Sequence, residues 1–155
     1  MLETITLAAS YPLRLMATWL SVGCLRLFGV DVEADRTLIT LGGEGVRIAV
    51  TDACSGMEQL LGLVLVGGVF AFMMQRSMLL KLMHWATILL CVVLANAVRL
   101  IATVVLVRNV GEVVLGDTWH MALGWAQTVL AVALLWLFGI CISHASSSDA
   151  KKEAD

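Results

Sequence analysis

Long apolar runs constrain the fold of this chain more than any other feature of its sequence. Of its 155 residues, 60% are hydrophobic and only 14% are charged, whereas a soluble domain has about 25% charged residues. Runs of about 20 apolar residues are long enough to cross the hydrocarbon core of a bilayer as helices. The sequence therefore predicts an all-α polytopic membrane protein. The formal net charge of −2 provides no basic surface that would indicate nucleic-acid binding.

Four of these runs are expected to form transmembrane helices, at residues 11–30, 57–74, 78–107 and 118–142. The first run carries Arg14 and Arg26 near its ends, where both can reach the membrane surface, so an interfacial helix is the alternative for it. Residues 1–143 are assigned to one transmembrane domain. The polar tail 144–155 is expected to be disordered and cytoplasmic.

The polar segment between the first two runs has the pattern of a β-hairpin. Residues 36–41 and 46–51 are β-rich and flank a glycine-containing turn that begins at Gly42. Arg76 and Lys81 mark the turn between the second and third runs as cytoplasmic, because basic residues near membrane spans favour that side. The hairpin is therefore expected on the extracytoplasmic face.

One cysteine stands beside the predicted start of the second membrane helix. Ser55 and Glu58 form the S-x-x-E pattern of a capped helix start, which makes Glu58 a capping partner rather than a catalytic acid. Cys54 would then lie beside free backbone N–H groups and the positive end of the helix dipole, which favours a nucleophilic thiolate. The remaining cysteines lie in apolar runs, where the residue usually behaves as a small hydrophobe, and they are Cys24, Cys91 and Cys141.

Three polar residues are predicted to meet at one membrane face. With alternating spans, the start of the second, the end of the third and the start of the fourth share a face, and these carry Cys54, Arg99 and His120. Arg99 lies 21 residues after Met78, which is roughly 32 Å of helix and close to the hydrocarbon thickness. Asn96 shares the helical face of Arg99 and either orients it or bonds across helices. The trio supplies a nucleophile, a base and an electrostatic partner.

Each member of the trio also has a simpler interpretation. A membrane cysteine such as Cys54 can serve packing alone, Arg99 can extend to the interface, and His120 beside Trp119 can anchor a helix there. These interpretations explain the residues separately but not their convergence. No His, Cys, Asp and Glu spacing resembles a metal site, so neither a metal nor another cofactor is expected. His84 is expected on the opposite membrane side.

The motifs Ala53-Cys54-Ser55-Gly56, Asn96-x-x-Arg99 and His120-x-x-x-Gly124, in this order, resemble the exosortase/archaeosortase family of polytopic membrane cysteine transpeptidases. The resemblance covers roughly residues 30–138. It implies that Cys54 is the nucleophile and that Arg99 and His120 complete the catalytic set. Many members have more spans, so this chain resembles the family's catalytic core alone. Gly124 is expected to let a neighbouring helix approach rather than to contact substrate.

The resemblance implies cleavage of exported proteins that carry a C-terminal sorting motif, a transmembrane helix and a basic tail. Cys54 would form a thioester with the substrate and transfer it to an unknown acceptor. Arg99 would stabilise the oxyanion and His120 would move protons, because a guanidinium stays charged at any working pH. The implied place is the cell inner (cytoplasmic) membrane, with the active site on the extracytoplasmic face.

Two other functions stay open at this point. A hydrolytic membrane protease would act on the same signal and release the product to water. A non-catalytic membrane scaffold or assembly factor would use the same fold without needing Cys54. A channel is disfavoured because the ionisable residues gather at one interface and do not line a path. The lipid bilayer and the exported protein are the expected partners, and a homo-oligomer or a membrane partner stays open.

Overall fold

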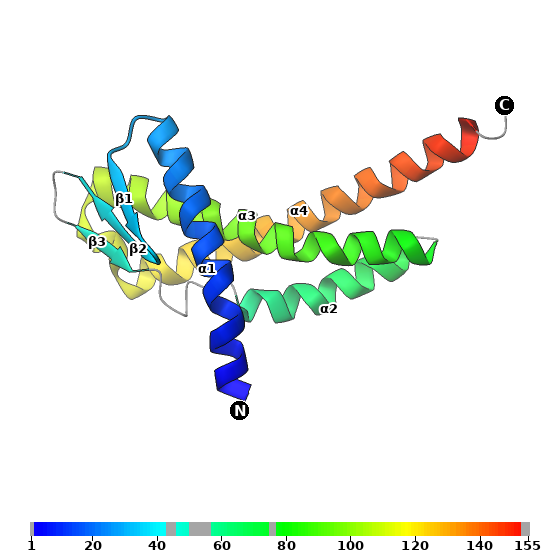
Figure 1. Ribbon diagram of the computed structural model, residues 1–155, viewed down its shortest axis with the longest axis horizontal. Coiled ribbons are helices and arrows are strands. Elements are labelled where there is room, and N and C mark those ends of the chain that lie inside the picture. The colour runs from blue at the N-terminus through cyan, green and yellow to red at the C-terminus, as the bar shows by residue number, and fades with distance from the viewer. Residues whose placement is uncertain (1, 43–45, 50–56, 75–76, 153–155) are drawn as a thin grey trace.

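The computed structural model describes residues 2–42, 46–49, 57–74 and 77–152 of the chain. Helices make up most of it (Figure 1), which confirms a mostly helical fold. In chain order the elements are α1 (Leu2–Leu27), β1 (Val32–Asp35), β2 (Leu38–Leu41), β3 (Arg47–Ala49), α2 (Met57–Met74), α3 (Met78–Val110), the short 3-10 helix η2 (Glu112–Leu115) and α4 (Asp117–Lys152).

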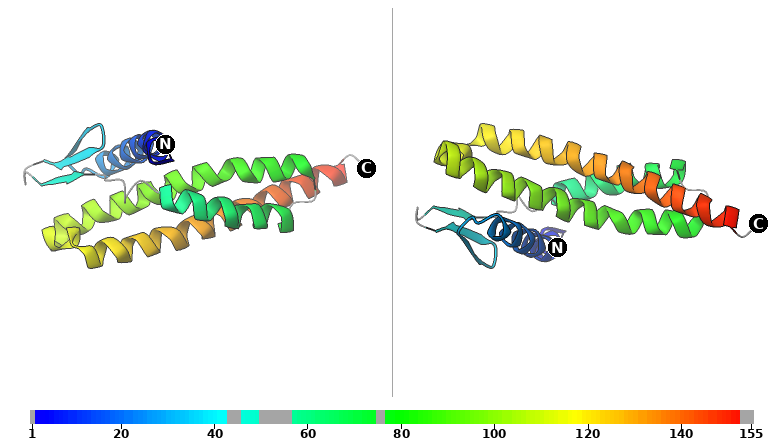
Figure 2. Two further views of the ribbon diagram at one scale, coloured as in Figure 1. Left: turned by 90° about the horizontal axis from the view of Figure 1, so that it is seen from below. Right: turned by 90° about the horizontal axis from the view of Figure 1, so that it is seen from above.

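Helices α2, α3 and α4 pack along one axis around a shared apolar core (Figures 1 and 2). Small residues let these helices approach closely, as expected for membrane helices. A Cβ atom on Gly67 would lie 2.7 Å from the Cδ1 of Ile88 and 3.1 Å from a methyl carbon of Leu135. This contact joins all three helices. The core around it contains Leu63, Ile88, Cys91, Val92, Ala95, Ala131 and Leu135.

Two helices in the described residues are long and apolar enough to cross a membrane. They are α3 and the Asp117–His144 part of α4, and α2 adds a shorter apolar stretch, Gly62–Met73. The most apolar window of α4 is only 22% buried inside the protein, so much of this helix is left for lipid. The expected total of four spans is therefore supported for α3 and α4, while α1 and α2 as full spans stay predictions.

Helix α1 crosses α3 at a steep angle instead of running alongside the other helices (Figures 1 and 2). The crossing is close, because the Ser21 Oγ donates to the carbonyl of Ala97 at 3.1 Å. Ala97 is two residues from Arg99, so the C-terminal third of α1 lies near the end of α3 that was placed at the interface. This arrangement favours the interfacial alternative for the first helix. Trp19 is 67% exposed, which suits a side chain at a membrane surface.

The expected β-hairpin is present as part of a three-stranded antiparallel sheet. Strands β2 and β3 form the hairpin, with Leu38 opposite Ala49. Strand β1 pairs with the other edge of β2 and was not predicted, because Val-Glu-Ala-Asp lacks a β-branched pattern. Arg36 takes a φ of 55° in the tight turn that joins β1 to β2. This left-handed conformation is uncommon for a residue with a Cβ atom.

The sheet is attached to the helices through its apolar face. Val32, Ile39, Leu41 and Ile48 join a second core cluster that also contains Leu25 of α1, Leu100, Val104 and Val107 of α3, and Val114 of η2. Because this cluster contains the part of α3 that follows Arg99, the sheet is held beside that residue.

The C-terminal part of the chain differs from the sequence expectation. Helix α4 continues to Lys152, so it runs through most of the tail for which the composition predicts disorder. Alanine and lysine have high helix propensities and allow the helix to propagate past the apolar part. The division into a domain at 1–143 and a tail at 144–155 stays a prediction.

Replacing Gly67 with leucine should lower the stability of the bundle, because the new side chain would displace Ile88 and Leu135. We expect a loss of roughly 1–3 kcal/mol, typical of an overpacked core. The same substitution at Gly62, where a Cβ would meet no described atom within 4 Å, is the matched control. Thermal unfolding in detergent measures both. Equal midpoints for the two variants would contradict the packing described here.

Candidate active site

A sharp chain reversal at Gly111 brings the predicted site residues of α3 and α4 together. Gly111 ends α3 with a φ of 99°, a conformation that glycine adopts without strain, and its N–H donates to the carbonyl of Val107 at 2.8 Å. The short helix η2 follows, and α4 begins at Asp117, one residue before the expected start of the fourth run. Helix α4 therefore returns antiparallel to α3, with its first turn beside Arg99.

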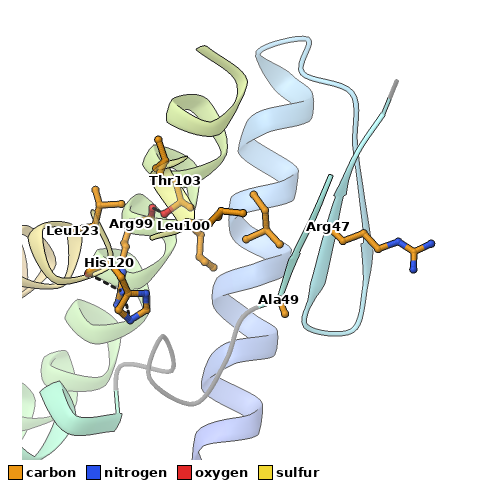
Figure 3. A pocket seen from close by; sticks show the side chains of 10 residues that line it. Arg47, Ala49, Arg99, Leu100, Thr103, His120 and Leu123 are labelled. Atoms are coloured by element: carbon orange, nitrogen blue, oxygen red, sulfur yellow. Dashed lines mark hydrogen bonds between the residues drawn. The ribbon is translucent and has the colours of Figure 1, made fainter. Parts of the chain in front are cut away.

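The guanidinium of Arg99 is the centre of the site. Arg99 is 8% exposed, and its Nη2 lies 3.1 Å from the Nε2 and 3.4 Å from the Nδ1 of His120. The same Nη2 donates to the backbone carbonyl of His120 at 3.4 Å. The predicted proximity of these two residues is therefore present in the structure (Figure 3).

The contact with Arg99 engages the ring nitrogens of His120. A guanidinium has N–H donors and no acceptor, so a ring nitrogen that receives its hydrogen bond must carry a lone pair. A neutral imidazole can accept a proton from another group, which is the chemical requirement for a general base.

Gln127 completes the polar network and was not identified from the sequence. Its Oε1 accepts from the Nη1 of Arg99 at 3.1 Å, and its Nε2 donates to the Oδ1 of Asn96 at 3.4 Å. Gln127 is 2% exposed and Asn96 is 1% exposed. Of the two roles considered for Asn96, the structure contains the bond across helices, and through Gln127 this bond also steadies Arg99.

A sequence signal for Gln127 existed. It is a single amide in an apolar run, seven residues after His120, and two helical turns put both residues on one face of α4. Polar side chains within membrane helices usually face the interior of the bundle. Applied to α4, that rule would have placed Gln127 in the bundle interior, on the helix face that carries His120.

A cavity of about 230 Å³ opens beside the polar network. Arg99 and His120 line it from α3 and α4, and the cavity extends to strand β3 (Figure 3). The remaining lining residues are Arg47, Ile48 and Ala49 of β3, Leu100 and Thr103 of α3, Val114 and Leu115 of η2, and Leu123 of α4. The cavity is thus lined by a guanidinium, an imidazole and the edge of a sheet.

The start of α2 lies level with Arg99 along the bundle. Met57 lies ten residues before Gly67, and Val98 lies ten residues after Ile88. Since Gly67 contacts Ile88 and the two helices are antiparallel, both steps cover about 15 Å of helix in the same direction. Helix α2 therefore begins at the depth of the polar network.

Several predicted site residues cannot be compared with the geometry. Cys54, Ser55 and Gly56 lie outside the described residues. Glu58 belongs to the first turn of α2, and its side chain also lies outside them. Their roles as nucleophile, motif residues and capping partner stay predictions.

The packing role predicted for Gly124 stays a prediction. A Cβ atom at this position would meet no described atom within 4 Å. His84 is fully buried in α3, about 22 Å along the helix from Arg99 at 15 residues' distance, which separates it from the site. Within the described residues, no three His, Cys, Asp or Glu side chains gather as a metal site would require.

Comparison with known proteins identifies one family. The family model described as transmembrane exosortase matches residues 1–137. The searches of curated proteins and of solved structures found no match.

Replacing Gln127 with leucine should destabilise the protein by about 1–3 kcal/mol, because Arg99 and Asn96 would each lose a partner inside the bundle. Gln127→Glu keeps an acceptor for Arg99 and should stay closer to the native midpoint. Thermal unfolding in detergent compares the two variants. A leucine variant as stable as the native protein would show that the network does not support this part of the fold.

Proposed function

The chain belongs to the transmembrane exosortase family, and on this basis we propose that it is a membrane-embedded cysteine transpeptidase. It cleaves the C-terminal sorting signal of exported proteins through a thioester on Cys54 and transfers the product to an acceptor. The observation that carries the proposal is the contact of Arg99 with His120 beside a cavity at the depth where α2 begins. Cys54 precedes that helix start by three residues.

In the first step the thiol of Cys54 passes its proton to His120 and attacks the carbonyl carbon of the scissile peptide bond. A new C–S bond forms, and the carbonyl oxygen becomes an oxyanion. Once protonated, the ring nitrogen of His120 can no longer accept from Arg99. The guanidinium is then free to donate to the oxyanion, a kind of stabilisation worth about 2.7–4 kcal/mol for one donor.

In the second step the oxyanion collapses and the C–N bond breaks. His120 gives its proton to the departing amine, which leaves a thioester and a neutral ring. The acceptor nucleophile then passes its proton to His120 and attacks the thioester, which restores the Cys54 thiol. Transfer and hydrolysis differ only in this acceptor, which is an unknown nucleophile in one case and water in the other.

We place the site on the extracytoplasmic face of the cell inner membrane. The sheet, η2 and the polar network all lie toward the α3–α4 turn, at the opposite end of α3 from Lys81. Lys81 and its neighbour Arg76 are the basic residues that favour the cytoplasmic side. Exported proteins with a sorting motif, a transmembrane helix and a basic tail would thus meet the site after translocation.

Replacing Cys54 with alanine should abolish processing, because no thioester can form. The substrate is a co-expressed exported protein of the same genome that ends in a short motif, an apolar span and a basic cluster. Mass spectrometry of this protein shows the cleavage point and any attached group, which separates transfer from hydrolysis. Cys141→Ala is the matched control, since Cys141 is an exposed cysteine late in α4. Normal processing by Cys54→Ala would support a non-catalytic scaffold instead.

His120→Gln and Arg99→Lys should each lower the rate of processing, for different reasons. The first removes the group that moves protons, an effect of about 10²–10⁴-fold. The second keeps a positive charge but loses the planar donor pair, and we expect a loss of about 10²–10³-fold. His144→Gln, far along the same helix as His120, should stay within about twofold of the native rate. Initial rates of substrate cleavage in detergent or proteoliposomes compare the three variants.

A further inference from the structure

Strand β3 meets the cavity along its edge. Its three residues, Arg47, Ile48 and Ala49, all line the cavity. Successive side chains of a strand point to opposite faces, so three consecutive residues can border one cavity only where the strand presents its edge. Figure 3 agrees, because the Arg47 side chain points away from Arg99 and His120 while its strand borders the space. The backbone of β3 is therefore what this side of the cavity offers.

The register of the sheet identifies which backbone groups face that edge. The N–H of Leu41 donates to the carbonyl of Val46 at 3.0 Å, so Leu41 and Val46 form a hydrogen-bonded pair. Such pairs alternate along an antiparallel ladder, which makes Ile39 and Ile48 the next one. The backbone N–H and C=O groups of Arg47 and Ala49 therefore point away from β2.

That outer edge has no strand beside it within the described parts of the chain. The sheet has the order β1-β2-β3, so β3 is a terminal strand. Its position is held by Ile48, which is 6% exposed in the cluster shared with α3 and η2. An anchored edge whose backbone groups bond no other described strand is a template for one more strand.

We propose that the sorting segment of the substrate binds as a fourth strand on the outer edge of β3. This inference rests on the proposed function, and it names how the site holds its substrate. A peptide bond can be attacked only when the chain around it is accessible, and an extended segment paired to a strand meets that condition. Pairing also satisfies the backbone groups of the segment where little water is available.

The continuity of the cavity supports this occupant. The same space borders the edge of β3 and the side chains of Arg99 and His120. A paired segment advances by about 3.3 Å per residue, so a few residues beyond β3 suffice to bring a peptide bond to the catalytic side chains. A small soluble molecule would not need the backbone donors and acceptors of a strand, whereas an extended peptide does.

Ala49→Pro tests the pairing directly. Proline removes the outward N–H of Ala49 and leaves the bonds of Ile48 to β2 in place, as proline is tolerated at such edge positions. Ala34→Pro is the matched control. Glu33 and Ala34 lie opposite Thr40 and Ile39, and because β2 uses Ile39 to bond β3, Ala34 points outward on the other edge of the sheet. Ala34 does not line the cavity.

We expect Ala49→Pro to lower kcat/KM for the sorting-signal substrate by about tenfold, mostly through a higher KM, as for a lost hydrogen bond plus a blocked edge. Ala34→Pro should stay within about twofold. A second measurement leaves the native enzyme unchanged. It uses a series of peptides that span the cleavage point found by mass spectrometry. In each peptide one backbone amide is replaced by an ester, which removes one N–H group. The cleavage rate should fall when the ester stands at every second position of the series.

The outcomes separate the two proposals. If cleavage depends on Cys54 but the ester series shows no alternation, or Ala49→Pro cleaves as well as Ala34→Pro, the pairing is wrong and the transpeptidase stands. If Cys54→Ala cleaves as well as the native protein, the proposed function itself fails. Alternating losses together with a selective effect of Ala49→Pro support strand pairing.

Discussion

The hydrogen bonds of the buried Arg99 guanidinium to α4 are the interaction on which the rest of the structure depends. A charged group inside an apolar helix bundle costs several kcal/mol unless its donors are satisfied. Helix α4 supplies the partners, because Gln127 accepts from one Nη and His120 from the other. These bonds require one rotation of α4 about its axis and one register against α3. The turn at Gly111 and the apolar core beside Gly67 are both compatible with this rotation and register of α4 against α3.

The same interaction explains how a structural network can also be a site for chemistry. The bond from Arg99 to Gln127 lies inside the bundle, whereas the bond to His120 faces the cavity. The first holds the guanidinium in place, and in the proposed mechanism the second is exchanged for an oxyanion when His120 takes up a proton. Strand β3 lines the opposite side of the cavity. Ile48 packs in the apolar core that surrounds the end of α3 and so fixes the strand there. The guanidinium of Arg99, the imidazole of His120 and the outer edge of β3 thus line one cavity.

Much of the helical part could be predicted from the sequence, because the apolar runs are long and their ends are polar. The expected bounds 57–74 are those of α2, and the third helix was expected to begin at Met78, as it does. The proximity of Arg99 to His120 also followed from the alternation of the spans and from helix length. Strand β1, Gln127 and the steep crossing of α1 were not predicted. A four-residue strand carries little pattern, and an amide in an apolar run shows its partner only when the opposing helix is known.

The sequence by itself determined that the protein belongs in a membrane, where its helices begin, and that Arg99 and His120 lie at one depth. The depth of a residue in a membrane helix depends only on the residue count and the rise per residue, and both can be read from the sequence. Only the tertiary structure decided which side chains of α4 face Arg99, that α1 lies across α3, and that β3 turns its edge to the cavity. These are properties of rotation and crossing between elements. Side-chain packing sets them, as at Ser21 against Ala97 and Gly67 against Ile88, and no single run of residues contains that information.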